Sequence, residues 1–131
     1  MFELGGSTLK LIDAINEIDS IKPNTYSQQE KIRWISILDG NIKKEIIDTH
    51  EGAENVTFNG YDNNTDISTE LLVPAPYDDI YIRWLEMQID YANADLVKYQ
   101  NSMTLYNNAY SNFEKYYNRN NMPKGKKFKF F

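Results

Sequence analysis

The side chains with the most obvious catalytic potential in this sequence are one histidine and the carboxylates around it. His50 is the only histidine, and Asp48, Glu51 and Glu54 lie within a few residues of it. Such a set could hold a metal ion or exchange protons with a substrate. A single histidine at the end of a helix more often complements the helix dipole. We therefore expect a structural role for His50, with catalysis as the open alternative.

A second group of oxygen ligands lies in a polar stretch. Asp62, Asn64 and Asp66 have the spacing with which a helix–loop–helix calcium site begins. Such a loop then needs a glycine for its sharp turn and a bidentate glutamate at its end. This sequence has Ile67 and Val73 at those two positions. The pattern therefore favours a solvated acidic loop over a calcium site.

The sequence contains few residues that could support other kinds of catalysis. Glycoside hydrolysis would need two carboxylates to converge across a cleft, whereas acids along an exposed helical face are ordinary. The sequence has no cysteine, P-loop, dinucleotide-binding glycine pattern or G-x-S-x-G motif. We expect no enzymatic activity, no catalytic residue, no metal and no cofactor. The carboxylates that could contradict this expectation are Asp78, Asp79, Glu86, Asp90 and Asp95.

The charge is distributed unevenly along the chain. The 131 residues include 14 Lys+Arg and 19 Asp+Glu, for a formal net charge of −5. Four of the lysines fall in the last eight residues, so residues 1–120 keep 10 basic and 19 acidic side chains, a net charge of −9. We expect a single helical domain over residues 1–120 and a basic, aromatic arm over residues 121–131.

The sequence gives no sign of membrane insertion or export. No apolar run approaches the roughly 18 residues that span a bilayer. The first residues lack the basic and apolar segments of a signal peptide. We therefore expect a soluble protein inside the cell, without a membrane partner.

The elements that position these residues are mostly helices. Apolar residues three or four apart from Leu11 to Ile18 predict a first helix, which Ser7 could cap. The capping box Ser27–Glu30 begins a second helix that should end near His50. Gly40 within it predicts a bend or a close contact.

The region between residues 51 and 76 is less regular. Asn59-Gly60 between short apolar stretches predicts a small hairpin near residues 55–62. We name Phe58, Asn59, Gly60 and Tyr61 the contact loop, because an exposed polar turn suits contact with a partner. Residues 71–73 should form an extended segment buried against the core.

The most regular pattern covers residues 77–118, where apolar and aromatic side chains recur three or four apart. One continuous helix would be roughly 60 Å long. A domain of this size has a radius of gyration of only about 14 Å. We therefore predict two helical segments, with a break near residues 100–102 that Ser102 could cap; one projecting helix is the alternative.

The aromatic stripe in this region has two compatible interpretations. Its side chains could pack in the core, or the excess tyrosine could form a subunit interface, since a phenol adds apolar area and tolerates a wet rim. The residues predicted for such an interface are Tyr99, Tyr106, Tyr110, Phe113 and Tyr117.

The C-terminal residues also have two interpretations. A basic tail can simply be a disordered, solubilising end. The alternation of lysine with phenylalanine instead favours an arm that adds to a neighbouring surface, for example as an edge strand. The arm residues predicted for this contact are Lys126, Lys127, Phe128, Phe130 and Phe131.

Several segments together resemble one protein family, although none is a chemical signature. The sequence resembles the small helical head–tail connector proteins, also called head-completion or adaptor proteins, of phages and prophages of Gram-positive bacteria. The segments that carry the resemblance are Ile21-Lys22-Pro23-Asn24 with Tyr26-Ser27, Thr49-His50-Glu51-Gly52, Phe58-Asn59-Gly60-Tyr61-Asp62, Glu70-Leu71-Leu72-Val73-Pro74-Ala75-Pro76-Tyr77, Gln88-Ile89-Asp90-Tyr91-Ala92-Asn93, Tyr116-Tyr117-Asn118-Arg119 and Met122-Pro123.

The resemblance implies a non-enzymatic structural subunit of the virion. Several copies would self-associate as a ring beneath the portal protein, and a tail-completion or stopper protein would bind the other side. DNA would pass through the lumen without specific binding, which an acidic body would favour if its carboxylates face inward. The protein would be located in the virion, and in the host bacterial cytoplasm during assembly.

The fold class expected from all these patterns is mainly all-α: a small helical bundle with a long or broken C-terminal helix, a hairpin-like loop and extended terminal arms. The main functional alternative is a cytosolic interaction module that dimerises through the stripe of apolar and aromatic residues at heptad spacing in residues 77–118. A hydrolase with an acidic site ranks below both.

Overall fold

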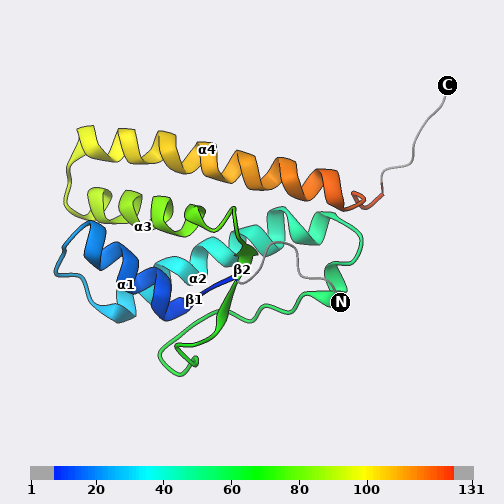
Figure 1. Ribbon diagram of the computed structural model, residues 1–131, viewed down its shortest axis with the longest axis horizontal. Helices are drawn as coiled ribbons and strands as arrows, with labels where there is room; N and C mark the ends of the chain where they lie inside the picture. Colours follow the sequence, from blue (N-terminus) through cyan, green and yellow to red (C-terminus); the bar gives the residue numbers. More distant parts are fainter. Residues whose placement is uncertain (1–7, 126–131) are drawn as a thin grey trace.

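Four α-helices and a two-stranded sheet account for the regular structure of residues 8–125, the part of the chain that the computed structural model describes (Figure 1). This confirms the expected mainly helical bundle. The elements are β1 (Thr8–Lys10), α1 (Leu11–Ile21), α2 (Gln28–Glu45), the 3₁₀ turns η1 (Ile47–Thr49) and η2 (Ala53–Asn55), β2 (Glu70–Pro74), α3 (Asp79–Ala92) and α4 (Leu96–Asn120).

Helix α3 lies in the middle of the bundle. Figure 1 shows α4 along one side of α3, with α1 and α2 on the other. Its buried face contributes Ile80, Leu85 and Ile89, which are almost fully enclosed. Each such side chain stabilises the fold by about 1.5–3 kcal/mol relative to an exposed position. The core thus forms on both sides of α3.

The start of α2 follows the predicted capping box. The Glu30 amide donates to Ser27 Oγ at 3.1 Å, and the Ser27 amide donates to Glu30 Oε1 at 2.9 Å. The helix ends at Glu45, earlier than predicted, and η1 continues the chain toward His50. Helix α1 begins after Lys10, whereas Ser7 lies outside the described residues.

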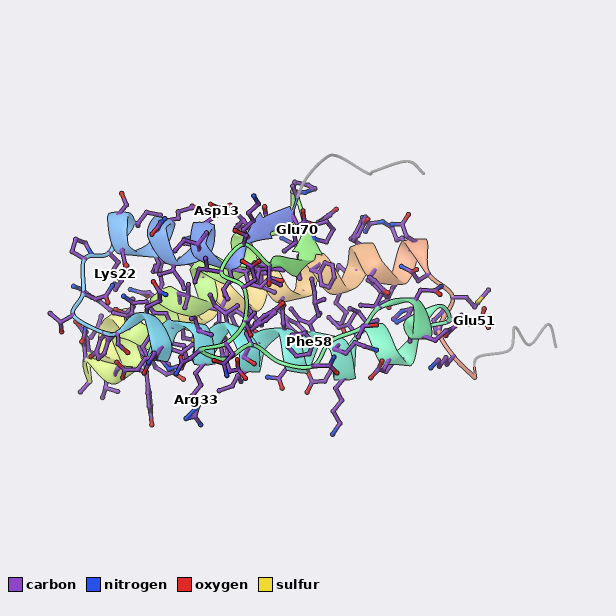
Figure 2. The ribbon with its side chains drawn as sticks, turned by 90° about the horizontal axis from the view of Figure 1, so that it is seen from below. Asp13, Lys22, Arg33, Glu51, Phe58 and Glu70 are labelled. Carbon is purple, nitrogen blue, oxygen red and sulfur yellow. The ribbon has the colours of Figure 1, made fainter. Side chains whose placement is uncertain are left out.

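Gly40 lies beside Phe58 of the contact loop, but the spacing is not an unusually close contact. A Cβ atom at Gly40 would lie 3.7 Å from Cε2 of Phe58. This is an ordinary van der Waals distance, so the packing of Phe58 beside α2, which Figure 2 shows, does not require glycine at position 40.

The predicted hairpin near residues 55–62 is wrong. Residues 56–69 form no strand, and the sheet instead pairs β1 with β2, antiparallel and with Thr8 opposite Pro74. The short flanks of Asn59-Gly60 do not pair, because their aromatic residues pack against α2. The chain still turns at Gly60, whose φ is +89°, and the next amide, of Tyr61, donates to Ser36 Oγ at 2.9 Å.

Residues 79–120 form two antiparallel helices, which confirms the predicted division. The predicted position of the break at residues 100–102 is wrong, because α3 ends at Ala92 and α4 begins at Leu96. Asp95 caps α4 by accepting from the Lys98 amide at 3.1 Å. Ser102 lies inside α4 and donates its hydroxyl to the buried carboxylate of Asp90.

The first residues of the predicted arm pair with the body of the protein. Pro123 bridges to His50, and the Lys124 amide donates to the Thr49 carbonyl at 2.7 Å. The rest of the arm lies outside the described residues, so the structure places none of its predicted contact residues: Lys126, Lys127, Phe128, Phe130 and Phe131.

Candidate interaction surface

One end of the bundle, which we call the tip, exposes large apolar side chains. The tip consists of the end of α1 and the turn between α3 and α4, which lie at the same end in Figure 1. Its apolar residues are Ile21, exposed to 55%, Tyr91 to 68%, and Leu96 and Val97 to 71% each. They are the four most exposed large apolar side chains in residues 8–125. Clustered exposed apolar residues commonly mark an interaction site.

The tip is also concave. A hollow of about 410 Å³ opens between the end of α3 and the start of α4. The rings of Tyr91 and Tyr99 meet at its wall, with centroids 5.4 Å apart. An apolar hollow with aromatic walls suits an apolar or aromatic side chain of a partner. The lining residues are Asp90, Tyr91, Ala92, Ala94, Asp95, Leu96 and Tyr99.

A tight helix ending shapes the turn at the tip. The Asp95 amide donates to the Asp90 carbonyl, and the Ala94 amide donates to the Tyr91 carbonyl, each at 3.0 Å. This is the Schellman pattern, which usually has glycine at its left-handed position. Ala94 takes that position here with φ at +58°. The turn therefore carries backbone strain of about 1 kcal/mol.

An ion pair between the partly exposed Lys22 and the buried Asp90 supports the tip. Asp90 is 1% exposed, and Lys22 Nζ lies 2.8 Å from its Oδ1. The Tyr26 hydroxyl donates to Asn93 Oδ1 at 2.5 Å, which also ties the α1–α2 loop to the end of α3. These contacts fix the two parts of the tip relative to each other.

The opposite end of the bundle, which we call the base, carries several polar side chains together with the exposed Met122. It comprises residues 49–52 and 118–125, and Figure 2 shows Glu51 there, far from Lys22 at the tip end. The Glu51 amide donates to the Met122 carbonyl at 2.7 Å. A hollow of about 460 Å³ is lined here by Asn118, Arg119, Asn120, Asn121, Met122 and Pro123. The two ends thus present different chemistry.

His50 serves the structure of the base. Its Nδ1 lies 2.6 Å from the Ile46 carbonyl oxygen and its Nε2 lies 2.7 Å from Asn118 Oδ1. The imidazole ring is 4% exposed. The ring of Tyr117 packs against it edge to face, with the two ring centroids 4.9 Å apart. The predicted role at a helix end is confirmed, since His50 contacts the carbonyl of the residue that caps the end of α2.

The carboxylates near His50 do not gather around it. Asp48 pairs with Lys43 on the surface, and Glu51 and Glu54 are exposed. Within residues 8–125, no group of three or more histidine or acidic side chains could hold a metal ion.

Within the described part of the chain, the other acidic groups lie at separate places in the fold and do not converge on one site. In the polar loop, Asp62 accepts from the Asn64 amide and Asp66 accepts from the Ser68 amide, as in ordinary turns. On α3, Glu86 pairs with Arg83. Asp78 and Asp79 lie at the start of α3, while Asp90 and Asp95 lie at the tip.

The stripe tyrosines mostly face the interior. Phe113 is only 1% exposed and packs in the core. Tyr106 packs on Trp84 with centroids 5.0 Å apart, and the Tyr110 hydroxyl donates to Glu45 Oε1 at 3.0 Å. Burial raises the pKa of both phenols. Of the five predicted interface residues, the structure brings Tyr99 to the tip.

The contact loop is only partly open to a partner. Asn59 and Gly60 are exposed, whereas Phe58 is half-buried against α2 and Tyr61 is buried. The loop is therefore anchored by its two aromatic residues.

A buried carboxylate on α2, missed in the sequence, holds three elements together. Asp39 accepts from the hydroxyls of Tyr61 and Tyr81, each at 2.6 Å, and from the Leu72 amide at 3.2 Å. Burial raises the pKa of Asp39 to about 6, although these hydrogen bonds lower it in part. We call these four residues the clasp. The sequence did contain a signal for this buried carboxylate, because Asp39 lies next to Leu38 within the apolar stripe of α2.

No helix within residues 8–125 is both long enough and apolar enough to span a bilayer. Comparisons of the chain with protein-family models, with curated proteins and with solved structures found no match.

Proposed function

We propose that this protein is a structural virion subunit, a head–tail connector. In this proposal several copies dock as a ring beneath the portal protein and join it to a tail-completion or stopper protein. The work of such a subunit is binding at two ends, and it needs no reactive side chain.

The observation that carries the proposal is the position of the segments that resemble connector proteins. Residues 21–24 and 88–93 lie at the tip, where Lys22 pairs with Asp90. Residues 49–52, 116–119 and 122–123 lie at or next to the base, where His50 contacts Asn118 and Pro123. The remaining segments lie between the ends and include β2 and Tyr61 of the clasp.

The different chemistry of the two ends supports two different partners. The tip offers exposed apolar side chains, among them Ile21 at the end of α1. The base offers asparagine side chains and an ordered crossing of two chain segments. A subunit that joins two unlike proteins needs two unlike surfaces.

Charge supports passage of DNA through the proposed ring. Residues 1–120 carry a formal net charge of −9. If these carboxylates face the lumen of the ring, the lumen does not retain phosphates and DNA passes without specific binding.

Co-assembly with purified portal rings tests the proposal. We expect the wild-type chain to co-sediment with portal rings and then to recruit the stopper protein. Ile21→Glu at the tip should abolish one of these two steps, because it places a charge on an apolar contact surface outside the tip hollow. Ile37→Glu is the matched control, since Ile37 is also a helical isoleucine and is exposed to 42%.

Failure of the wild-type chain to bind portal rings under all salt conditions would refute the connector role. A stable dimer that ignores portal rings would instead favour the rival hypothesis, a cytosolic module that dimerises through the stripe. Gene neighbourhood provides a separate check, since portal, capsid and tail genes should flank a connector gene.

A further inference from the structure

The exposed apolar surface of the tip could be covered by another segment of the same protein. The candidate with the clearest chemistry in the same sequence is the end of the arm, residues 126–131. This segment contains three phenylalanines and three lysines and no acid. Its root, Gly125, lies at the base, because Pro123 and Lys124 pair with His50 and Thr49.

The distance between root and tip excludes contact within one chain. Helix α4 joins the two ends with 25 residues, which corresponds to about 37 Å at 1.5 Å per residue. Six residues reach at most about 21 Å when fully extended. Residues 126–131 therefore cannot reach the tip of their own chain, but they can reach the tip of a neighbour.

The chemistry of the two surfaces is complementary. A phenyl ring fits the apolar hollow beside Tyr91 and Tyr99, where aromatic pairs gain about 0.5–1.5 kcal/mol beyond area burial. The exposed side chains of Leu96 and Val97 extend the apolar surface. The lysines of the arm approach a body with a net charge of −9, which favours the encounter between copies.

We propose that residues 126–131 of one copy bind the tip of a second copy, with a phenylalanine in the tip hollow. Donor and acceptor lie at opposite ends of the bundle, so the contact is head-to-tail. Such contacts close into a ring when the rotation between copies permits and otherwise continue as a filament. The inference deepens the connector proposal and rests on it for the closed ring, while the contact itself can be tested without a portal.

Engineered disulfides provide the test, because the natural chain has no cysteine. One preparation carries Val97→Cys at the tip, and separate preparations carry Phe128→Cys, Phe130→Cys or Phe131→Cys in the arm. Each arm variant is mixed with the tip variant and oxidised. We expect at least one mixed pair to link about tenfold more than the control pair, because a bound arm raises the effective thiol concentration to the millimolar range.

The control pair replaces the tip variant with Leu105→Cys, which lies on α4 and away from the tip hollow. Circular dichroism and melting curves verify that every variant folds; Val97 and Leu105 are exposed positions of α4. Linkage no greater than in the control pair, at the highest soluble concentration, would overturn the inference. Preferential linkage of Val97→Cys with itself would also overturn it and would indicate a tip-to-tip dimer.

The two proposals fail in different ways. A chain that links arm to tip but ignores portal rings retains this contact and loses the connector role. A chain that binds portal rings without any link between arm and tip retains the connector role and loses this contact.

Discussion

The clasp buries a polar group, whereas the tip exposes apolar groups. At the clasp, Asp39 is completely buried and three donors from the loop, β2 and α3 converge on it. At the tip, Leu96 and Val97 remain mostly exposed although a bundle could bury such residues. The clasp therefore holds the protein together, whereas the tip is available for binding. Stability and association should respond to separate substitutions.

The largest expected effect comes from removing the clasp carboxylate. Asp39→Ala leaves two hydroxyls and one amide buried without their acceptor, so the free energy of unfolding should fall by about 3–5 kcal/mol. Urea denaturation followed by circular dichroism measures this change. Asp48→Ala is the control, since its exposed ion pair with Lys43 should contribute less than about 1 kcal/mol. Equal effects of the two substitutions would remove the distinction drawn for the clasp.

The pH dependence of stability should identify the same carboxylate. The pKa of Asp39 rises from 3.8 to about 6 in the folded protein because burial disfavours the charged form. Between these values the folded state binds more protons than the unfolded state, so stability falls as pH rises. The fall amounts to about 3 kcal/mol, present below pH 4 and lost by about pH 6.

Asp39→Asn lacks this titration and supplies the reference curve. The difference in unfolding free energy between wild type and variant, measured from pH 3 to pH 7, should change with that sign. A difference that stays constant across this range would show that Asp39 does not titrate as inferred.

A smaller effect, opposite in sign, is expected at the turn of the tip. Ala94→Gly relieves the strain of a left-handed alanine and should raise the unfolding free energy by about 0.5–1 kcal/mol. Thermal melting measures the change. Ala92→Gly, in the last turn of α3, should lower stability instead, because glycine there only loosens the helix.

The smallest effect on stability should come with a large effect on association. The double substitution Leu96→Ser with Val97→Ser changes exposed residues, so the unfolding free energy should move by less than about 0.5 kcal/mol. The same variant should lose the disulfide link between arm and tip, for which the tip cysteine is then placed at Ala92→Cys. A loss of several kcal/mol of stability would mean that the tip is part of the core.

The sequence predicted what depends on local periodicity and missed what depends on contacts between distant residues. The stripe from Leu11 to Ile18 and the capping box at Ser27 act within one helix, and both were found. The break between α3 and α4 was misplaced because Ser102 serves a distant carboxylate, Asp90, and not its own helix terminus.

The candidate surface shows the same limit. Apolar spacing continues through Ala92 and Leu96, so the pattern alone could not show that the chain reverses there and leaves these residues at an exposed tip. The hairpin at Asn59-Gly60 failed for a related reason, because Tyr61 buries its ring against α2 and reaches Asp39. In each case a tertiary contact outweighed a local preference.

The pairing at the base has a mechanical consequence for any assembly that uses the arm. Tension applied to the chain beyond Gly125 would first load the hydrogen bonds from Lys124 to Thr49 and from Glu51 to Met122. Through His50, the load would then be shared between the end of α2 and the last turn of α4. The hydrogen bonds of the base would thus spread tension on the C-terminal residues over several elements of the bundle.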